Sequence, residues 1–182
     1  MKRIYIKLFM LGALTLFFGS KAKAQEFKDL DSSPHDIVYF RTNKVSPPTI
    51  KVLYGRPKKD GREIFGNVIP FGKIWRVGAN EATEVVFYND VVFGDQEVKA
   101  GTYVLYAIPD KNEWTLILSS NTDVWGTYEY ETKYDVARAR AKVSKAEFLE
   151  AFSIGFKDKG KHVNMVLAWD TTRITTPIKI IL

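Results

Sequence analysis

Short segments in which apolar and polar residues alternate recur along most of the chain. Alternation with a period of two places successive side chains on opposite faces of a β-strand, so each segment predicts a strand with one buried face. These segments lie at residues 50–54, 83–88, 91–93, 102–108, 114–118, 134–143, 152–156, 163–169 and 174–180. The long helical patterns that a parallel βαβ sheet would require between strands are missing. The sequence therefore predicts an all-β fold, an antiparallel two-sheet β-sandwich with Greek-key-like connections.

One segment is regular enough to predict what each face of its strand carries. Residues 135–143 alternate between small residues (Ala137, Ala139, Ala141) and bases (Arg138, Arg140, Lys142), which gives the strand a small face and a basic face. Ser144 and Glu147 then match a capping box and predict a short helix, so the fold is expected to contain at most one or two short helices. Pro177 predicts an edge position for the last segment, because proline cannot donate to a central ladder.

The first 24 residues have the organisation of an export signal. Three bases (Lys2, Arg3 and Lys7) precede an apolar stretch at residues 8–18, and an Ala-x-Ala cleavage site ends at Ala24. An apolar run of about 11 residues is shorter than the roughly 20 that span a bilayer, which favours cleavage over a retained membrane anchor. We expect cleavage between Ala24 and Gln25, and release of the mature protein into the periplasm or the medium.

Removal of the signal defines the domains and changes the charge. We expect a polar leader at residues 25–48 and a single β-domain at residues 49–182, with no later segment apolar enough to cross a membrane. The whole chain has 27 Lys and Arg residues against 21 Asp and Glu residues, a net charge of +6. Five of the bases but none of the acids lie in the signal, so the mature charge falls to about +1 and nucleic acids are not expected as partners.

The chain contains no cysteine, which excludes disulfides, thiolate metal sites and cysteine nucleophiles. Its two histidines, His35 and His162, do not stand at metal-binding spacing, and a Gly-x-Ser-x-Gly nucleophile elbow is missing. We therefore expect no cofactor and no metal.

The run from Trp75 to Thr83 concentrates the most unusual chemistry. Gly78 and Asn80 tolerate positive φ, so the backbone can turn sharply there. Arg76, Asn80 and Glu81 add a bidentate donor, an amide and a carboxylate. Two interpretations stay open: the loop holds a small polar ligand, or Trp75 enters the core while Arg76 and Glu81 pair to tie the loop down.

The same run contributes to a family resemblance. It is accompanied, in order along the chain, by Tyr54-Gly55-Arg56-Pro57, Gly61-Arg62 with Ile64-Phe65-Gly66, Ala100-Gly101-Thr102-Tyr103 and Trp125-Gly126. Together these motifs resemble domain-of-unknown-function family 2911 of exported bacterial proteins. Val77 departs from the family, in which threonine is expected. The resemblance implies a shared fold and an exported protein, and it implies no activity.

The preferred functional hypothesis is a binding module without catalytic activity. We expect it to bind a small polar or carbohydrate-like ligand, or a partner protein of the cell envelope, through Arg56, Arg62, Trp75, Arg76, Asn80 and Glu81. The three arginines can converge on an anion if their loops share one end of the fold, and otherwise they are solvated or salt-bridged separately. Trp125 and the nearby Tyr128 and Tyr130 offer ring faces that stack on sugars or pack against the core.

Two alternatives belong to other functional classes. A small hydrolase acting on cell-envelope glycans or esters would use Glu81 or Glu84 as acid or base, with Asp123 and Glu129 as further carboxylates. A purely structural protein would pair with a partner through an exposed edge strand. The sequence leaves the oligomeric state open.

Overall fold

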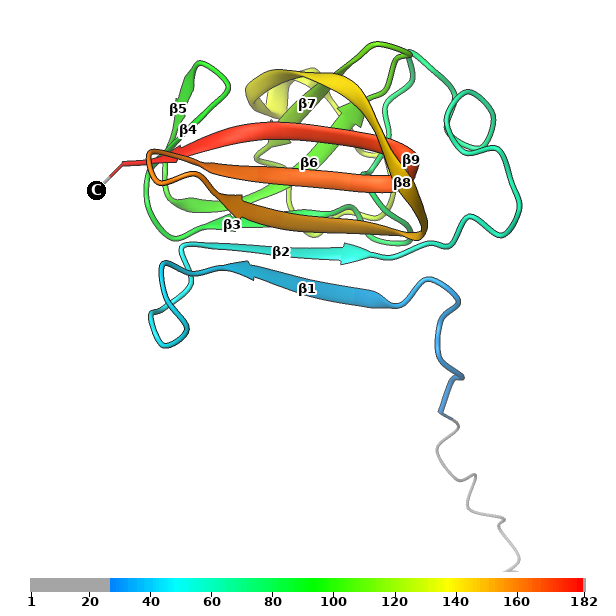
Figure 1. The fold of residues 1–182 in the computed structure, drawn as a ribbon, viewed down its shortest axis with the longest axis horizontal. Helices are drawn as coiled ribbons and strands as arrows, with labels where there is room; N and C mark the ends of the chain where they lie inside the picture. Colours follow the sequence, from blue (N-terminus) through cyan, green and yellow to red (C-terminus); the bar gives the residue numbers. More distant parts are fainter. Residues whose placement is uncertain (1–26, 182) are drawn as a thin grey trace, which may run out of the picture. The chain divides into compact units, whose positions relative to one another are not determined.

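Nine antiparallel strands hydrogen-bond into one sheet (Figure 1). The structure, a computed structural model, describes residues 27–181, and the expected export signal at residues 1–24 lies outside them. Residues 31–181 form the unit considered below, and residues 27–30 contain no helix or strand. The strands are β1 (His35–Phe40), β2 (Ile50–Gly55), β3 (Glu84–Phe87), β4 (Val91–Phe93), β5 (Gln96–Val98), β6 (Gly101–Ile108), β7 (Glu113–Ser119), β8 (Asp135–Asp158) and β9 (Val163–Ile180).

The order across the sheet is β1-β2-β3-β6-β7-β8-β9-β4-β5, and every neighbouring pair is antiparallel. The expected all-β antiparallel class is thus confirmed. β1, expected as part of a polar leader, pairs with β2 along its whole length.

The sheet is continuous because β8 belongs to both of its halves. Residues 135–142 of β8 pair with β7, and residues 143–158 pair with β9. In Figure 1 this strand runs as one long curved ribbon, yellow to orange. The structure therefore contains one hydrogen-bonded sheet where two were expected. β1 and β5 stand at the ends of the strand order, so the sheet does not close.

The prediction of a short helix after Ser144 is wrong, because this segment belongs to β8. Ser144 and Lys145 pair with Arg173 and Thr172 of β9, and the register then shifts before Leu149. Pairing with β9 gives the backbone at Ser144 and Lys145 hydrogen-bond partners in a strand, and the register shift follows. The side chains of Ser144 and Glu147 are exposed and cap no helix. The only helix within residues 27–181 is the 3₁₀ turn η1 (Thr132–Tyr134), and it is far too short to cross a membrane.

Pro177 occupies a gap in the pairing of β9. Pairing of β9 with β8 reaches Ile174, and pairing with β4 begins at Ile178. β9 lies between β8 and β4, so the edge position predicted from Pro177 is wrong. Pro177 itself lies between the two ladders, where a backbone N–H is not needed as a donor.

The alternation predicted for residues 135–143 is confirmed. Ala137, Ala139 and Ala141 are buried, and the bases between them are exposed. The small face leaves space for the turn between β4 and β5, where a Cβ on Gly94 would lie 3.0 Å from the Ala139 Cβ.

Large aromatic residues fill the core between the two halves of the sheet. Trp75 stacks on Trp169 with ring centroids 6.3 Å apart, and it meets Trp114 and Phe152 edge to face at 5.9 and 5.2 Å. Such contacts add to the free energy gained from burying these large side chains. The residues come from β7, β8, β9 and the loop before β3, so one aromatic cluster joins both halves.

Phe152→Ala should lower the free energy of unfolding by about 3 to 5 kcal/mol, because Phe152 is fully buried in this cluster and truncation leaves a cavity. Phe148→Ala in the same strand is the matched control. Its side chain is 57% exposed, and we expect a change within about 0.5 kcal/mol. Urea titration followed by tryptophan fluorescence measures both variants. Equal losses would contradict the assignment of the core.

Candidate functional site

The loop at residues 75–83 lies directly against the end of β2. A Cβ on Gly55 would lie 2.0 Å from the carbonyl oxygen of Ala79, and a Cβ on Gly78 would lie 2.8 Å from the carbonyl oxygen of Gly55. Real Cβ atoms do not approach backbone oxygens so closely. The crossing of two backbones therefore requires glycine at both positions.

Hydrogen bonds within the loop fix its shape. Trp75 exchanges two backbone hydrogen bonds with Ala107 of β6 and buries its ring. The indole Nε1 of Trp75 donates to the Gly78 carbonyl at 3.2 Å, and the Thr83 hydroxyl donates to the Val77 carbonyl at 2.7 Å. The interpretation that Trp75 enters the core is confirmed.

The sharp turns fall at Val77 and Asn80, with φ of +56° and +62°. Positive φ was expected at Gly78 and Asn80, and Asn80 adopts it. Gly78 does not, and glycine is needed there because a Cβ would collide with the Gly55 carbonyl. A β-branched residue at positive φ is rare, and it costs on the order of 1 to 3 kcal/mol. Val77 is fully buried, so packing holds this strained backbone in place.

A pocket of about 780 Å³ opens on one side of the loop. Trp75, Arg76, Gly78 and Ala79 of the loop contribute to its lining. The other lining residues are Ser32, Ser33, Pro57, Asp60, Arg62, Val68, Ile69, Ile74, Thr127 and Trp169. We call it the Arg62–Arg76 pocket, because it brings together two of the three arginines that were expected to converge.

Arg76 has unused hydrogen-bonding capacity. Its guanidinium carbon lies 5.2 Å from the centre of the Trp125 ring, a cation–π contact. Its Nε is buried without a hydrogen-bond partner within residues 27–181. The expected pair between Arg76 and Glu81 does not form, since Glu81 pairs instead with His35 at 3.0 Å.

Arg62 is held in place by its neighbours. Its Nη2 donates to the Lys58 carbonyl at 2.6 Å and its Nε to the Lys59 carbonyl at 3.0 Å. These bonds use part of its donor set and fix a positive charge at the wall of the pocket.

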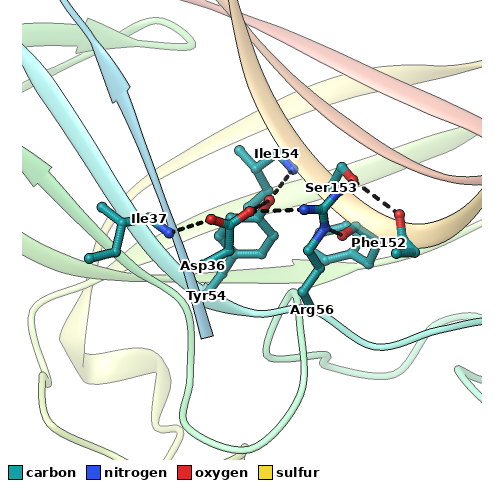
Figure 2. A network of polar contacts seen from close by, with 8 residues as sticks. Asp36, Ile37, Tyr54, Arg56, Phe152, Ser153 and Ile154 are labelled. Carbon is teal, nitrogen blue, oxygen red and sulfur yellow. Dashed lines mark hydrogen bonds and ion pairs between the residues drawn. The ribbon is translucent and has the colours of Figure 1, made fainter. Parts of the chain in front are cut away.

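Arg56 lies outside this pocket, in a polar network that ties β2 to β1 and β8 (Figure 2). Its guanidinium donates to Asp36 at 3.1 Å, to the Ser153 hydroxyl at 2.8 Å and to the Phe152 carbonyl at 3.1 Å. The Tyr54 hydroxyl joins the network and accepts from the Ile154 N–H at 3.1 Å. Burial raises the pKa of Tyr54. With these partners Arg56 holds strands together.

Asn80 and Glu81 are also absent from the lining of the pocket. The Asn80 side chain donates to the Ser33 carbonyl at 3.4 Å. Hydrogen bonds from the Ser33 N–H and from Asn80 lower the pKa of Asp31. Asn80 therefore fastens the segment that precedes β1.

A second pocket, of about 450 Å³, is lined by a different set of residues that includes the end of the loop. Glu81 lines it together with Glu84, Asp123 and His35. Three of the four carboxylates proposed for a hydrolase thus share one concavity. Within residues 27–181, no group of three or more His, Asp or Glu side chains is placed to hold a metal ion.

Four polar residues of the Arg62–Arg76 pocket were not predicted from the sequence. Ser32 and Ser33 precede β1, Asp60 lies in the loop after β2, and Thr127 follows the glycine after Trp125. The motif containing Trp125 and Gly126 was a signal for this region, whereas the Ser33 contact depends on long-range packing that no local pattern reveals.

Comparisons with known proteins give a family and nothing more specific. A family model described as "Protein of unknown function (DUF2911)" matches residues 33–178, which confirms the family suggested by the motifs. No curated protein and no solved structure matches the chain significantly.

Gly55→Ala should lower the free energy of unfolding by at least about 1 to 3 kcal/mol, because the new methyl group would overlap the Ala79 carbonyl. Gly155→Ala in β8 is the matched control, since nothing lies within 4 Å of the added Cβ. We expect this control to be at least as stable as the wild type. Thermal and urea unfolding measure both variants, and a stable Gly55→Ala protein would refute the tight crossing.

Proposed function

Since the chain belongs to the protein family DUF2911, whose description assigns no function, we propose that it is an exported binding module for a small polar ligand, carbohydrates included. The observation that supports this proposal best is the position of Arg76 in the wall of the Arg62–Arg76 pocket, where its Nε is buried without a hydrogen-bond partner within residues 27–181.

A buried donor without an acceptor is unfavourable in a folded protein. Leaving such a group unsatisfied costs about 1 to 3 kcal/mol, and more when it is charged. Arg76 is only half-buried, so the cost applies mainly to its Nε. Because Nε itself has almost no accessible surface, a ligand would reach Arg76 through its terminal nitrogens, and an acceptor oxygen there would compensate part of the unfavourable burial of the guanidinium.

The lining of the pocket suits a polar ligand. More of its accessible surface is polar than apolar, and the hydroxyl-bearing Ser33 and Thr127 line it together with the largely buried Trp75 and Trp169. Placed polar groups of this kind orient a bound small molecule. The strained Val77 next to Arg76 supports the same role, because strained backbone is concentrated at functional sites.

Export is the second part of the proposal. It is supported by the basic and apolar regions of residues 1–24 and by the cleavage site at Ala24. Mature protein in the periplasm or the medium would meet polar nutrients and cell-envelope material.

A second candidate function is hydrolysis at the other pocket. Glu81, Glu84 and Asp123 line it together, and His35 hydrogen-bonds Glu81. Paired carboxylates are the machinery of glycoside hydrolysis. This candidate uses a different set of lining residues, so the two functions can be tested separately.

Arg76→Ala should abolish ligand binding while the protein stays folded. A thermal-shift screen of sugars, amino acids and organic acids against the wild type identifies ligands that raise the melting temperature, as a ligand at 100 times its Kd adds about 2.7 kcal/mol of stability. Arg140→Ala is the control, because this arginine is exposed on β8 outside the Arg62–Arg76 pocket. If Arg76→Ala melts far below the wild type without ligand, the loop is structural and the proposal fails.

The hydrolase candidate predicts that the purified protein releases nitrophenol from chromogenic glycosides or esters. Glu84→Gln should then reduce release by about 100-fold or more, since general acid–base groups contribute that much. Glu113→Gln on β7, outside the second pocket, should leave the rate unchanged. Wild-type protein without measurable release would eliminate this candidate.

A further inference from the structure

We infer that the ligand of the Arg62–Arg76 pocket is a saccharide that carries a carboxylate. Arg76 would bind the carboxylate, and the exposed rings of Trp125 and Tyr128 would bind the sugar ring. The inference rests on the proposed binding function and adds the chemical class of the ligand.

The contacts of Arg76 favour an anion. The guanidinium lies over the Trp125 ring and its Nε is buried, so the edge formed by the two terminal Nη atoms is the one left for a ligand. That edge carries donors only, and its geometry matches the two oxygens of a carboxylate. A sugar hydroxyl can accept one such bond, but without the gain from opposite charge.

The charges in the pocket point in the same direction. Arg62 and Arg76 are the cations among its lining residues, and Asp60 is the one carboxylate. The guanidinium of Arg62 is fixed by two backbone carbonyls, so its charge stays at the wall. Two cations against one carboxylate leave a positive surplus that attracts an acidic ligand.

The neighbouring aromatic pair favours a flat ring. Trp125 and Tyr128 are stacked within 7° of parallel, with centroids 5.6 Å apart. Their side chains remain 51% and 82% exposed, although aromatic surface of this size is normally buried. The C–H face of a sugar ring would cover this surface, and the ring hydroxyls would stay in water.

Backbone contacts connect the aromatic pair to the arginine. Gly126, which adopts a φ of +68°, donates its N–H to the Asn80 carbonyl at 3.2 Å. A Cβ on Gly126 would lie 3.0 Å from Arg76 Nη1 and 3.3 Å from the Tyr128 ring. Thr127, between the two aromatic residues, lines the pocket itself. One ligand can therefore contact the guanidinium and the rings together.

Calorimetric titration of the purified protein tests this inference with a panel of uronic-acid oligosaccharides. The probes are trisaccharides from polygalacturonate, hyaluronate and alginate, each with its neutral methyl ester, and sodium sulfate. At least one acid should bind about tenfold or more tightly than its ester, because the charged hydrogen bonds are lost in the ester.

Three variants locate the binding. Arg76→Lys keeps the charge but loses the planar edge, and it should reduce the preference for the acid over the ester. Tyr128→Ala should weaken acid and ester alike by about tenfold, and its exposed position makes a folding defect unexpected. Tyr88→Ala, an exposed tyrosine beyond the other end of β3, should change neither affinity.

Each contrary result has a definite meaning. Equal binding of acids and esters, unaffected by Arg76→Lys, would overturn the acidic saccharide and leave the proposed binding function standing. Sulfate that binds as tightly as the acids, together with an inert Tyr128→Ala, would make this a site for small oxyanions and also overturn the inference. Failure of every oligosaccharide to bind overturns it outright, and failure of the wider thermal-shift screen as well would end the proposed function.

Discussion

The close crossing of the backbones at Gly55 and at Gly78 to Ala79 is the constraint on which the functional region depends. It holds the loop against the end of β2, and from that position Trp75 can reach the aromatic core while Arg76 remains at the surface. A side chain at either glycine would separate the two backbones. The pocket wall and the core would then be displaced together, because adjacent residues of one loop build both.

The loop contributes to two pockets of different charge. Arg62 and Arg76 line one of them together with Asp60, and Glu81 joins Glu84 and Asp123 around the other. A direct pair between Arg76 and Glu81 would have joined one charge of each pocket to the other. Glu81 binds His35 instead, so Glu81 does not neutralise the Arg76 guanidinium.

Local patterns predict the strands well, because burial on alternate faces leaves a direct trace in the sequence. The small and basic faces of residues 135–143 are one example, and the core position of Trp75 is another. What could not be predicted depends on distant partners. The Ser144 segment pairs with β9, and Arg56 binds Ser153, which is 97 residues away along the chain. The sequence suggested that Arg56, Arg62 and Arg76 could meet at one site, but only Arg62 and Arg76 line the pocket. Which arginines meet depends on packing between distant segments, which a local pattern does not record.

The last strand has a consequence for when the protein can fold. β4 pairs on one side with the short β5 and on the other with residues 178–180 of β9, and β9 also completes the pairing of β8. A growing chain therefore cannot assemble this half of the sheet until residues 178–180 have been synthesised. Such dependence on distant contacts slows folding, so the pairing of β4 is expected to be a late step.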